Sequence, residues 1–416
     1  MAGTRARRRA ERRERRRAVR RNAMAVAASA VVVVGTVSGM MSAVGDRSAR
    51  GSETPEVALA TPSFVPLPGI PAPAATPSHP APEPSAASSA ASASPARLVP
   101  SPGSAPAPSV ASAPPPAART AKPAARTEPA AGPLYRHPES QVLDWVGAHR
   151  DDPRRPLIES RIAARPAAVW FASYNPGTVT REVREVTAGA AAAGRVPVLV
   201  PYAIPDRDCG GASQGGAPDT AAYDGWIRDF AAGLGDGPAI VILEPDSVAL
   251  SDCLDGPARA ARYASLARAG RTIHAAAPGA KVYFDAGHSG WHAAPKQAAL
   301  LRAAGAAESG DGIFTNVSNF HRTADEAAYA RRVLGALGGP ARLGAVIDTS
   351  RNGNGAPPDG EWCDPAGRAL GRAPTTDTGE ARIDAYLWVK LPGEADGCAG
   401  AAGSFTPEYA YALAKG

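Results

Sequence analysis

The stretch "VPVLVPYAIPDRDC" at residues 196–209 decides the fold class of this chain. Its first nine residues are all apolar, which is typical of a strand buried on both faces of a parallel sheet. Three charged side chains follow at residues 206–208. A surface turn would accept such an ending, and so would the wall of a catalytic site. The endings of the other strands distinguish these two interpretations.

Six further apolar runs of strand length lie around this stretch, at residues 169–172, 239–245, 281–287, 312–319, 343–350 and 384–392. Helix-length segments separate most of them, among them 178–193, 220–234, 257–276 and 323–337. This alternation predicts an α/β fold in which helices cover a parallel sheet. Seven repeats favour a closed parallel (β/α) barrel in one domain, although the spacing also fits an open doubly wound sheet.

Polar or aromatic side chains accompany nearly every strand ending. They are Trp170, Tyr202, Asp206, Asp208, Glu244, Asp246, Asp285, His288, Trp291, Asn316, Asn319, Lys390, Glu394 and Asp396. In a parallel barrel the carboxyl ends of all strands meet on one face, where active sites are built. One strand that ends in Asp indicates a turn, but this concentration predicts a cleft, and residues 205–209 would form one of its walls.

The basic charge of the chain belongs to its N-terminus. Residues 1–50 carry 13 Arg and a net charge of +10, whereas the whole chain carries +6, so the remaining 366 residues carry −4. This distribution does not favour nucleic-acid binding, which needs basic residues on the folded domain. We therefore expect no nucleic-acid partner.

Residues 23–45 have no charged side chain and follow the basic residues 1–22. Such a run can span a bilayer and predicts a cytoplasmic N-terminus with an exported remainder, either secreted or anchored to the outer face of the cytoplasmic membrane. A cleaved signal peptide and an uncleaved anchor both fit, and so do the general and twin-arginine export routes. Residues 46–132, rich in Ala, Pro and Ser, predict a disordered linker to a domain at 133–416.

The chain has four cysteines, Cys209, Cys253, Cys363 and Cys398. An even number in an exported domain predicts two disulfides, which three pairings could form, and pairing of nearest neighbours is the simplest. The chain has no C-x-x-C pair, so we expect no zinc site. We expect no metal and no cofactor.

The predicted cleft combines carboxylates with tryptophans. Indole rings stack on the apolar faces of sugars, and carboxylates, amides and Lys bind sugar hydroxyls. Cleavage of a glycosidic bond needs a protonated carboxyl group, and inverting enzymes need a second group that activates water. Crowded carboxylates meet the first need because like charges raise the pKa of one partner. The cleft therefore favours polysaccharide hydrolysis.

The motifs at the strand endings carry a resemblance to a known family. "IPDRDCG", "ILEPDS", "YFDAGHSGWH", "TNVSNF", "IDTSRNGNG", "EWCDPAGRALG" and "LWVKLPGEADGC" resemble, in the same order, the glycoside hydrolase family 6 cellulases, and among them the bacterial endoglucanases. The resemblance covers nearly all of residues 133–416. It implies a distorted seven-stranded parallel barrel, hydrolysis of β-1,4-glucan with inversion, and disulfides Cys209–Cys253 and Cys363–Cys398.

The resemblance also implies residue roles. Asp246 is similar to the proton donor, Asp208 to the carboxylate that raises the donor's pKa and orders water, and Asp396 to the proposed base, which acts directly or through a water chain. Asp285 resembles a supporting carboxylate, and Ser213 resembles a residue of the loop that closes over the site. The positions similar to sugar-binding residues are Tyr202, Trp170, His288, Trp291, Asn319, Trp362, Lys390 and Glu394.

The remaining polar and aromatic residues have structural interpretations. We expect Glu244 and Asp206 to be structural, Arg207 to pair with nearby carboxylates, and Trp145, Trp226 and Trp388 to lie in the core. His274 and His321 have no motif around them. The short segments between paired cysteines predict an open groove that cuts a glucan chain internally.

Two alternatives to an enzyme remain at this point. One is a catalytically weak, surface-tethered polysaccharide-binding protein, and the other is an envelope protein that its linker spaces from the membrane. The presence of both Asp246 and Asp208 favours the enzyme. We expect a monomer whose partner is a β-1,4-glucan and which meets a membrane only through residues 23–45.

Overall fold

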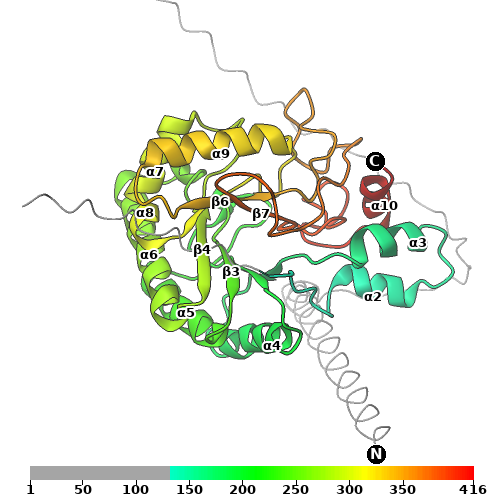
Figure 1. Cartoon of the computed structure of the whole chain (residues 1–416), viewed down its shortest axis with the longest axis horizontal. Helices are drawn as coiled ribbons and strands as arrows, with labels where there is room; N and C mark the ends of the chain where they lie inside the picture. Colours follow the sequence, from blue (N-terminus) through cyan, green and yellow to red (C-terminus); the bar gives the residue numbers. More distant parts are fainter. Residues whose placement is uncertain (1–131) are drawn as a thin grey trace, which may run out of the picture. The chain divides into compact units, whose positions relative to one another are not determined.

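The computed structural model describes residues 132–416, so the predicted segments 1–22, 23–45 and 46–132 lie outside the described residues apart from Gly132. Seven strands form one parallel sheet in sequence order, which curls around a central axis with helices on its outer side (Figure 1). The strands are β1 (Val169–Phe171), β2 (Val198–Pro201), β3 (Ala239–Leu243), β4 (Ala280–Asp285), β5 (Gly312–Thr315), β6 (Gly344–Asp348) and β7 (Ile383–Leu387). Each overlaps one predicted run, and most end earlier because the polar residues that follow belong to loops.

The four predicted helices are present as α4 (Val179–Ala192), α5 (Thr220–Leu234), α6 (Gly256–Ala276) and α9 (Thr323–Leu337). Two of them begin at an Asp that caps the first turn. Asp219 accepts the Ala222 N–H and Asp255 accepts the Ala258 N–H, which satisfies a donor that has no partner inside the helix. The other helical elements are α2 (Gln141–Ala148), α3 (Arg155–Ile158), the π-turn η1 (Glu159–Ala163), α7 (Ala294–Ala303), α8 (Ala306–Ser309), α10 (Pro407–Lys415) and the 3₁₀ turns η2 (Asp208–Gly210) and η3 (Ser251–Cys253).

The strands are buried on both faces, which explains their continuous apolar sequences. In β3, Ile240 and Ile242 belong to a cluster inside the curled sheet, together with side chains of β2 and β4–β7. Val241 and Leu243 belong to the larger cluster that includes the surrounding helices. This alternation is what the pleat of a strand requires. The predicted distorted seven-stranded barrel is confirmed.

The barrel is incomplete between β1 and β7. Within the described residues these two strands share no ladder and lie at the two ends of the strand order. Two hydrogen bonds join their neighbourhoods, from the Ala168 N–H to the Trp388 carbonyl at 2.9 Å and from Trp170 Nε1 to the Val389 carbonyl at 2.7 Å. The sheet therefore forms a barrel that no β-ladder closes between β1 and β7, and at this seam two isolated hydrogen bonds join the neighbouring segments.

A separate cluster covers this seam. Trp145 of α2 and Trp388 pack with apolar residues of α3, η1 and α10, which lie beside one another in Figure 1. Trp226 of α5 is completely buried in the main core, so the three tryptophans expected to be core residues are all buried, one in the main core and two in the separate cluster. No helix between residues 132 and 416 has both the length and the apolar character of a membrane-spanning segment.

Candidate active site

A groove of about 1260 Å³ follows the carboxyl ends of the strands. Of the side chains predicted to bind substrate or catalyse, all but Asp285 line it. They are Trp170, Tyr202, Asp208, Ser213, Asp246, His288, Trp291, Asn319, Trp362, Lys390, Glu394 and Asp396. Asp285 lies beneath the groove and is only 1% exposed. The structure thus brings the predicted site together at one face.

Asp246 lies on the turn that follows β3. It has a φ of 67°, and Glu244, two residues earlier, has a φ of 47°, so the chain turns sharply into the groove. Burial raises the pKa of Asp246 well above its ordinary value, and the nearby carboxylates of Asp285 and Asp208 raise it further. Asp246 therefore keeps a proton at pH values where an exposed Asp has lost it.

Asp285, at the end of β4, holds this turn in place. Its carboxylate accepts the main-chain N–H groups of Val248 at 3.1 Å, Ala249 at 2.7 Å and Gly287 at 2.9 Å. Burial raises the pKa of Asp285, and these hydrogen bonds oppose that increase. Asp285 thus positions the segment after Asp246 and places a carboxylate beneath it.

Glu244 is structural, as expected. Its side chain is fully buried and accepts the N–H groups of Ala203, at 3.0 and 2.9 Å to its two oxygens, and Ile204, at 3.0 Å. These contacts tie the end of β3 to the segment that leads from β2 to Asp208. Asp206 is exposed and does not line the groove.

Asp208 begins the turn η2 and faces Ser213. Its Oδ2 accepts the Ser213 N–H at 2.6 Å and the Ser213 hydroxyl at 3.0 Å. The chain that continues after Ser213 needs a glycine at position 216, where φ is 110°, because a Cβ there would lie 2.0 Å from the Ile204 carbonyl oxygen. Ser213 and Asp208 therefore form one unit on this wall.

Arg207 contacts carbonyl groups instead of the carboxylates that we expected. Its guanidinium donates to the main-chain carbonyls of Ser213 at 2.7 Å, Ala172 at 2.5 Å and Tyr202, and lies 4.6 Å from the centre of the Tyr202 ring. Among the ion pairs within residues 132–416 none includes Arg207. The expectation was wrong because the loop carbonyls come closer to the guanidinium than the carboxylates do.

Both predicted disulfides are present and flank the groove carboxylates. Cys209, next to Asp208, pairs with Cys253 of η3. Cys363 pairs with Cys398, two residues after Asp396. No cysteine among the described residues is free.

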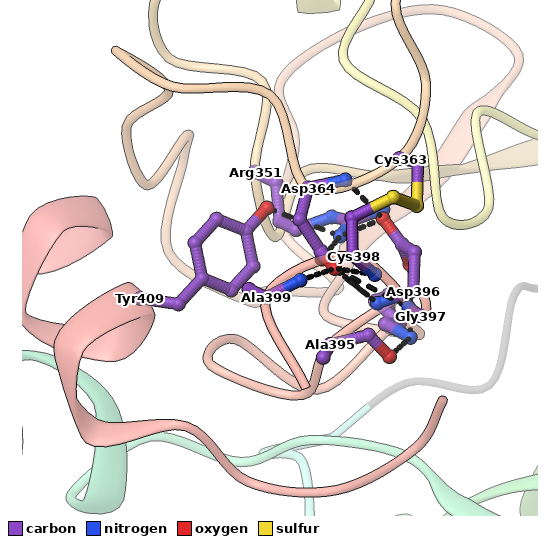
Figure 2. The surroundings of a disulfide bond; sticks show 10 residues. Arg351, Cys363, Asp364, Ala395, Asp396, Gly397, Cys398, Ala399 and Tyr409 are labelled. Atoms are coloured by element: carbon purple, nitrogen blue, oxygen red, sulfur yellow. Dashed lines mark hydrogen bonds and ion pairs between the residues drawn. A yellow bond between two sulfur atoms is a disulfide. The ribbon is translucent and has the colours of Figure 1, made fainter. Parts of the chain in front are cut away.

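Two cationic side chains contact the carboxylate of Asp396. Its Oδ2 lies 2.7 Å from the Arg351 guanidinium, and its Oδ1 lies 3.1 Å from the Lys390 ammonium. Arg351 is fully buried and also donates to the Tyr409 hydroxyl at 3.2 Å (Figure 2). Arg351 stands in the quoted motif "IDTSRNGNG", yet sequence reasoning gave it no role.

Aromatic rings line the groove together with the carboxylates. The rings of Trp170 and Tyr202 meet edge to face, with centroids 5.3 Å apart. His288 stacks on His321, with ring centroids 4.3 Å apart, and lies 5.3 Å from Trp291. Trp362 is 58% exposed at the groove. Flat rings at these positions suit the stacking of sugars.

His321 was missed by sequence reasoning, which assigned it no role, although it lines the groove. Gly290 makes its position possible, because a Cβ there would lie 2.7 Å from His321 Cε1. Burial, together with the neighbouring His321 and His292, lowers the pKa of His288 to about 3. Burial also lowers the pKa of His321, so near neutral pH both rings are uncharged. His274 lies elsewhere and pairs with Asp311 at 2.8 Å.

Glu394 joins the groove to helix α2. It accepts a hydrogen bond from Gln141 Nε2 at 2.9 Å, and Gln141 also bonds the main chain at Gly403 and Phe405. Burial raises the pKa of Glu394 to about 7, although Lys390 opposes the increase. Within residues 132–416 no three His, Cys, Asp or Glu side chains are grouped so that they could hold a metal ion.

A buried carboxyl group with a raised pKa, beside further carboxyl groups and aromatic rings, is the arrangement that cleavage of a glycosidic bond requires, so fold and groove together define a glycoside hydrolase. The chain belongs to the glycosyl hydrolases family 6, whose family model matches residues 127–415.

Similar proteins include endoglucanases from bacteria. Endoglucanase 1 of Streptomyces sp. (strain KSM-9) is 56% identical over 284 residues, which cover 68% of this chain and 78% of the relative. Endoglucanase A of Thermobispora bispora is 52% identical over 283 residues, 68% of this chain and 62% of the relative. A solved structure of an endoglucanase from Mycobacterium tuberculosis, in complex with a thio-linked cellobiosyl cellobioside, superposes with a TM-score of 0.65 at 41% identity and covers 70% of this chain and 99% of that one.

Proposed function

We propose that this protein is an endo-β-1,4-glucanase, which hydrolyses internal bonds of cellulose or a related β-glucan with inversion at the anomeric carbon. The observation that carries the proposal is the raised pKa of Asp246 in a groove lined by Trp170, Trp291 and Trp362. Relatives at 56% and 52% identity are named endoglucanases, which supports the same substrate class.

In the proposed reaction Asp246 donates its proton to the oxygen that leaves the anomeric carbon. Burial keeps this proton in place until the glycosidic oxygen accepts it, and Asp285 and Asp208 reinforce the effect. Asp208 and Ser213 order the attacking water on the opposite face of the sugar. The edge-to-face pair of Trp170 and Tyr202 supports the sugar ring beside the scissile bond.

We propose that Asp396 receives the second proton through a water chain rather than directly. Arg351 and Lys390 already occupy one oxygen each of its carboxylate, and the Asp364 N–H also donates to Oδ2 at 3.3 Å. Direct abstraction would need an oxygen that is free to approach the attacking water. Asp396 then acts as the charge toward which the proton moves.

The proposal extends to cleavage mode and location. The paired cysteines are separated by only 44 and 35 positions, which leaves little chain to roof the groove, and an open groove admits a polymer in mid-chain. The basic residues 1–22 and the uncharged run 23–45 support export, with the protein either secreted or held at the outer face of the cytoplasmic membrane.

Two measurements on soluble carboxymethylated cellulose and mixed-linkage glucan test the proposal. An internal cutter reduces viscosity early, while few new reducing ends exist. Proton NMR of the fresh products should show the α-anomer, since inversion converts a β-bond. Viscosity that falls only in step with released disaccharide would contradict the internal mode, and a β-anomeric first product would contradict inversion. If neither substrate released reducing ends, the proposal that the protein hydrolyses β-glucan would be contradicted.

A further inference from the structure

The carboxylate of Asp364 lies inside the loop that carries Asp396. Consecutive main-chain N–H groups of this loop point at it, from Asp396 at 2.8 and 2.9 Å, Gly397 at 3.3 Å, Cys398 at 3.0 Å and Ala399 at 2.9 Å (Figure 2). Successive N–H groups that converge in this way form a concave binding site for an anion. Here the anion is a side chain of the same molecule.

The contact between Asp364 and Asp396 is reciprocal. The Asp364 N–H donates to Asp396 Oδ2 at 3.3 Å, while the Asp396 N–H donates to both oxygens of Asp364. Arg351 lies near both carboxylates, 2.7 Å from Asp396 Oδ2 and 3.9 Å from Asp364 Oδ1. The side chain of Asp364 is only 1% exposed, so water does not compete for these contacts.

The neighbouring disulfide cannot replace this contact. Cys363–Cys398 links the residue before Asp364 to the residue two after Asp396, and so limits how far the two segments can separate. It leaves the peptide groups of residues 396–399 free to rotate. A single acceptor for four successive N–H groups fixes those peptide planes, and with them the direction in which the Asp396 side chain leaves the main chain.

Charge balance gives Asp364 a second effect on Asp396. Arg351 and Lys390 bring two positive charges, which Asp364 and Asp396 balance. Burial would raise the pKa of Asp364, but the N–H groups of Ala399, Asp396 and Cys398 together with Arg351 outweigh it, and the pKa lies below its ordinary value. Asp364 therefore stays ionised wherever the groove carboxylates are ionised.

We infer that Asp364 is a positioning residue for the proposed reaction, which orients Asp396 through the loop 396–399 and touches no substrate itself. The inference rests on the proposed function, because it needs Asp396 to take part in the chemistry. It does not depend on whether Asp396 acts directly or through water. Asp364 stands in the quoted motif "EWCDPAGRALG" without an assigned role, and it does not line the groove, since its side chain is buried.

A double-mutant cycle tests the inference. Asp364→Asn keeps the shape of the side chain but removes its charge and one acceptor. In the otherwise unchanged protein it should lower kcat on soluble β-glucan by about 100-fold, the loss expected when a reacting group is misplaced by about 1 Å. In an Asp396→Asn background it should change kcat by less than about twofold, because residues that act as a unit are not additive.

Binding and folding are measured in parallel. The dissociation constant of a thio-linked cello-oligosaccharide, followed by tryptophan fluorescence, should stay within about twofold, since the aromatic walls are untouched. Asp255→Asn is the matched control, because Asp255 is an exposed Asp that also accepts a main-chain N–H, that of Ala258 at 2.8 Å. This control should leave kcat unchanged.

Each other outcome overturns the inference. Equal losses of kcat in both backgrounds, or an unchanged kcat in Asp364→Asn, would show that Asp364 does not act through Asp396. Thermal unfolding checks that Asp364→Asn is folded. If it is not, Asp364→Ser replaces it in the same double-mutant cycle, and its losses of kcat in the two backgrounds are compared in the same way. A wild-type protein that releases no reducing ends would contradict the proposed function instead, so the two failures are distinguishable.

Discussion

Ser213 donates both its main-chain N–H and its hydroxyl to one oxygen of Asp208, at 2.6 and 3.0 Å. Both donors use Oδ2, so neither of them occupies Oδ1 of Asp208, which lines the groove. The sequence resemblance implied that the loop around Ser213 covers the substrate. The contacts show that this loop also fixes the Asp208 carboxylate.

The Ser213 hydroxyl can be removed without loss of the main-chain contact. Ser213→Ala should lower kcat on soluble β-glucan by about tenfold, the usual effect of one hydrogen bond to a charged group. Its KM should change little. Steady-state kinetics decide the point, with Ser160→Ala as control, because within residues 132–416 the Ser160 hydroxyl bonds only the Pro156 and Leu157 carbonyls of the preceding helix α3. A rise in KM at constant kcat would show that Ser213 binds sugar instead.

Removal of the Asp208 charge should move the pH profile. Burial contributes most to the raised pKa of Asp246, followed by Asp285 and then Asp208. In Asp208→Asn the acid form of Asp246 should therefore lose its proton at a lower pH. The basic limb of kcat/KM moves toward acid, and kcat falls because water is less well ordered. A lower rate with an unmoved basic limb would restrict Asp208 to the positioning of water.

Asp246→Asn removes the proposed proton donor. Turnover of unactivated glucan should fall by about 100- to 10,000-fold, the range that general acid catalysis contributes. A cellobioside whose leaving group is a dinitrophenolate needs no protonation and should lose far less. The two rates are compared in the same preparation. Equal losses on both substrates would exclude Asp246 as the acid.

Glu244 should make stability depend on pH. Burial raises its pKa in the folded protein to about 7, above the value of about 4.3 in an unfolded chain. Its stabilising contribution is therefore complete below about pH 4.3 and is lost as pH rises to about 7, a change on the order of 4 kcal/mol.

Urea unfolding across this pH range measures the effect of Glu244. Glu244→Gln imitates the protonated form and should flatten the decline in the free energy of unfolding between pH 4.3 and 7, both approximate limits. The exposed Glu308→Gln serves as control and should leave the decline unchanged. A decline that persists in Glu244→Gln would show that another group causes it.

Reduction of the disulfides should affect activity before it affects the fold. The bridges span 44 and 35 positions and each contributes about 4 kcal/mol in the chain-entropy model. Both hold loops of the groove, whereas the barrel core has no cysteine. With rising reductant, glucan hydrolysis should decline while the far-ultraviolet circular dichroism of the barrel persists. Simultaneous loss of both signals would show that the bridges stabilise the whole domain.

The strands and long helices could be predicted because their sequences contain the whole signal. A strand buried on both faces reads as an apolar run, as residues 239–243 do, and α5 has Asp219 as a cap. The short helices α2, α3 and α10 were not predicted, since their few apolar residues become buried only against one another. This cluster forms only when the segments at the two ends of the domain, 141–163 and 407–415, pack against each other.

For site residues, too, local sequence signals allowed prediction, whereas contacts between distant segments did not. Many residues in the quoted motifs could be given a role, whereas Asp364, although it lies in one of them, His321 and Gln141 could not. Asp364 reads as a turn residue until the loop 396–399 folds around it, and His321 gains a partner only because Gly290 leaves space. Gln141 lies more than 250 positions from Glu394 along the chain. No local pattern in a single sequence encodes such contacts.

The seam between β1 and β7 has a consequence for biosynthesis. Helix α2 is translated before α10 and before the loop at Gly403 and Phe405, yet it needs both to complete its cluster and to bond Gln141. While the ribosome is still translating this domain, the first strand has no partner across the seam and Trp145 has no cover. The seam bonds at Trp388 and Val389 therefore form only after these residues have left the exit tunnel, and the cluster around Trp145 is completed later still, when α10 follows.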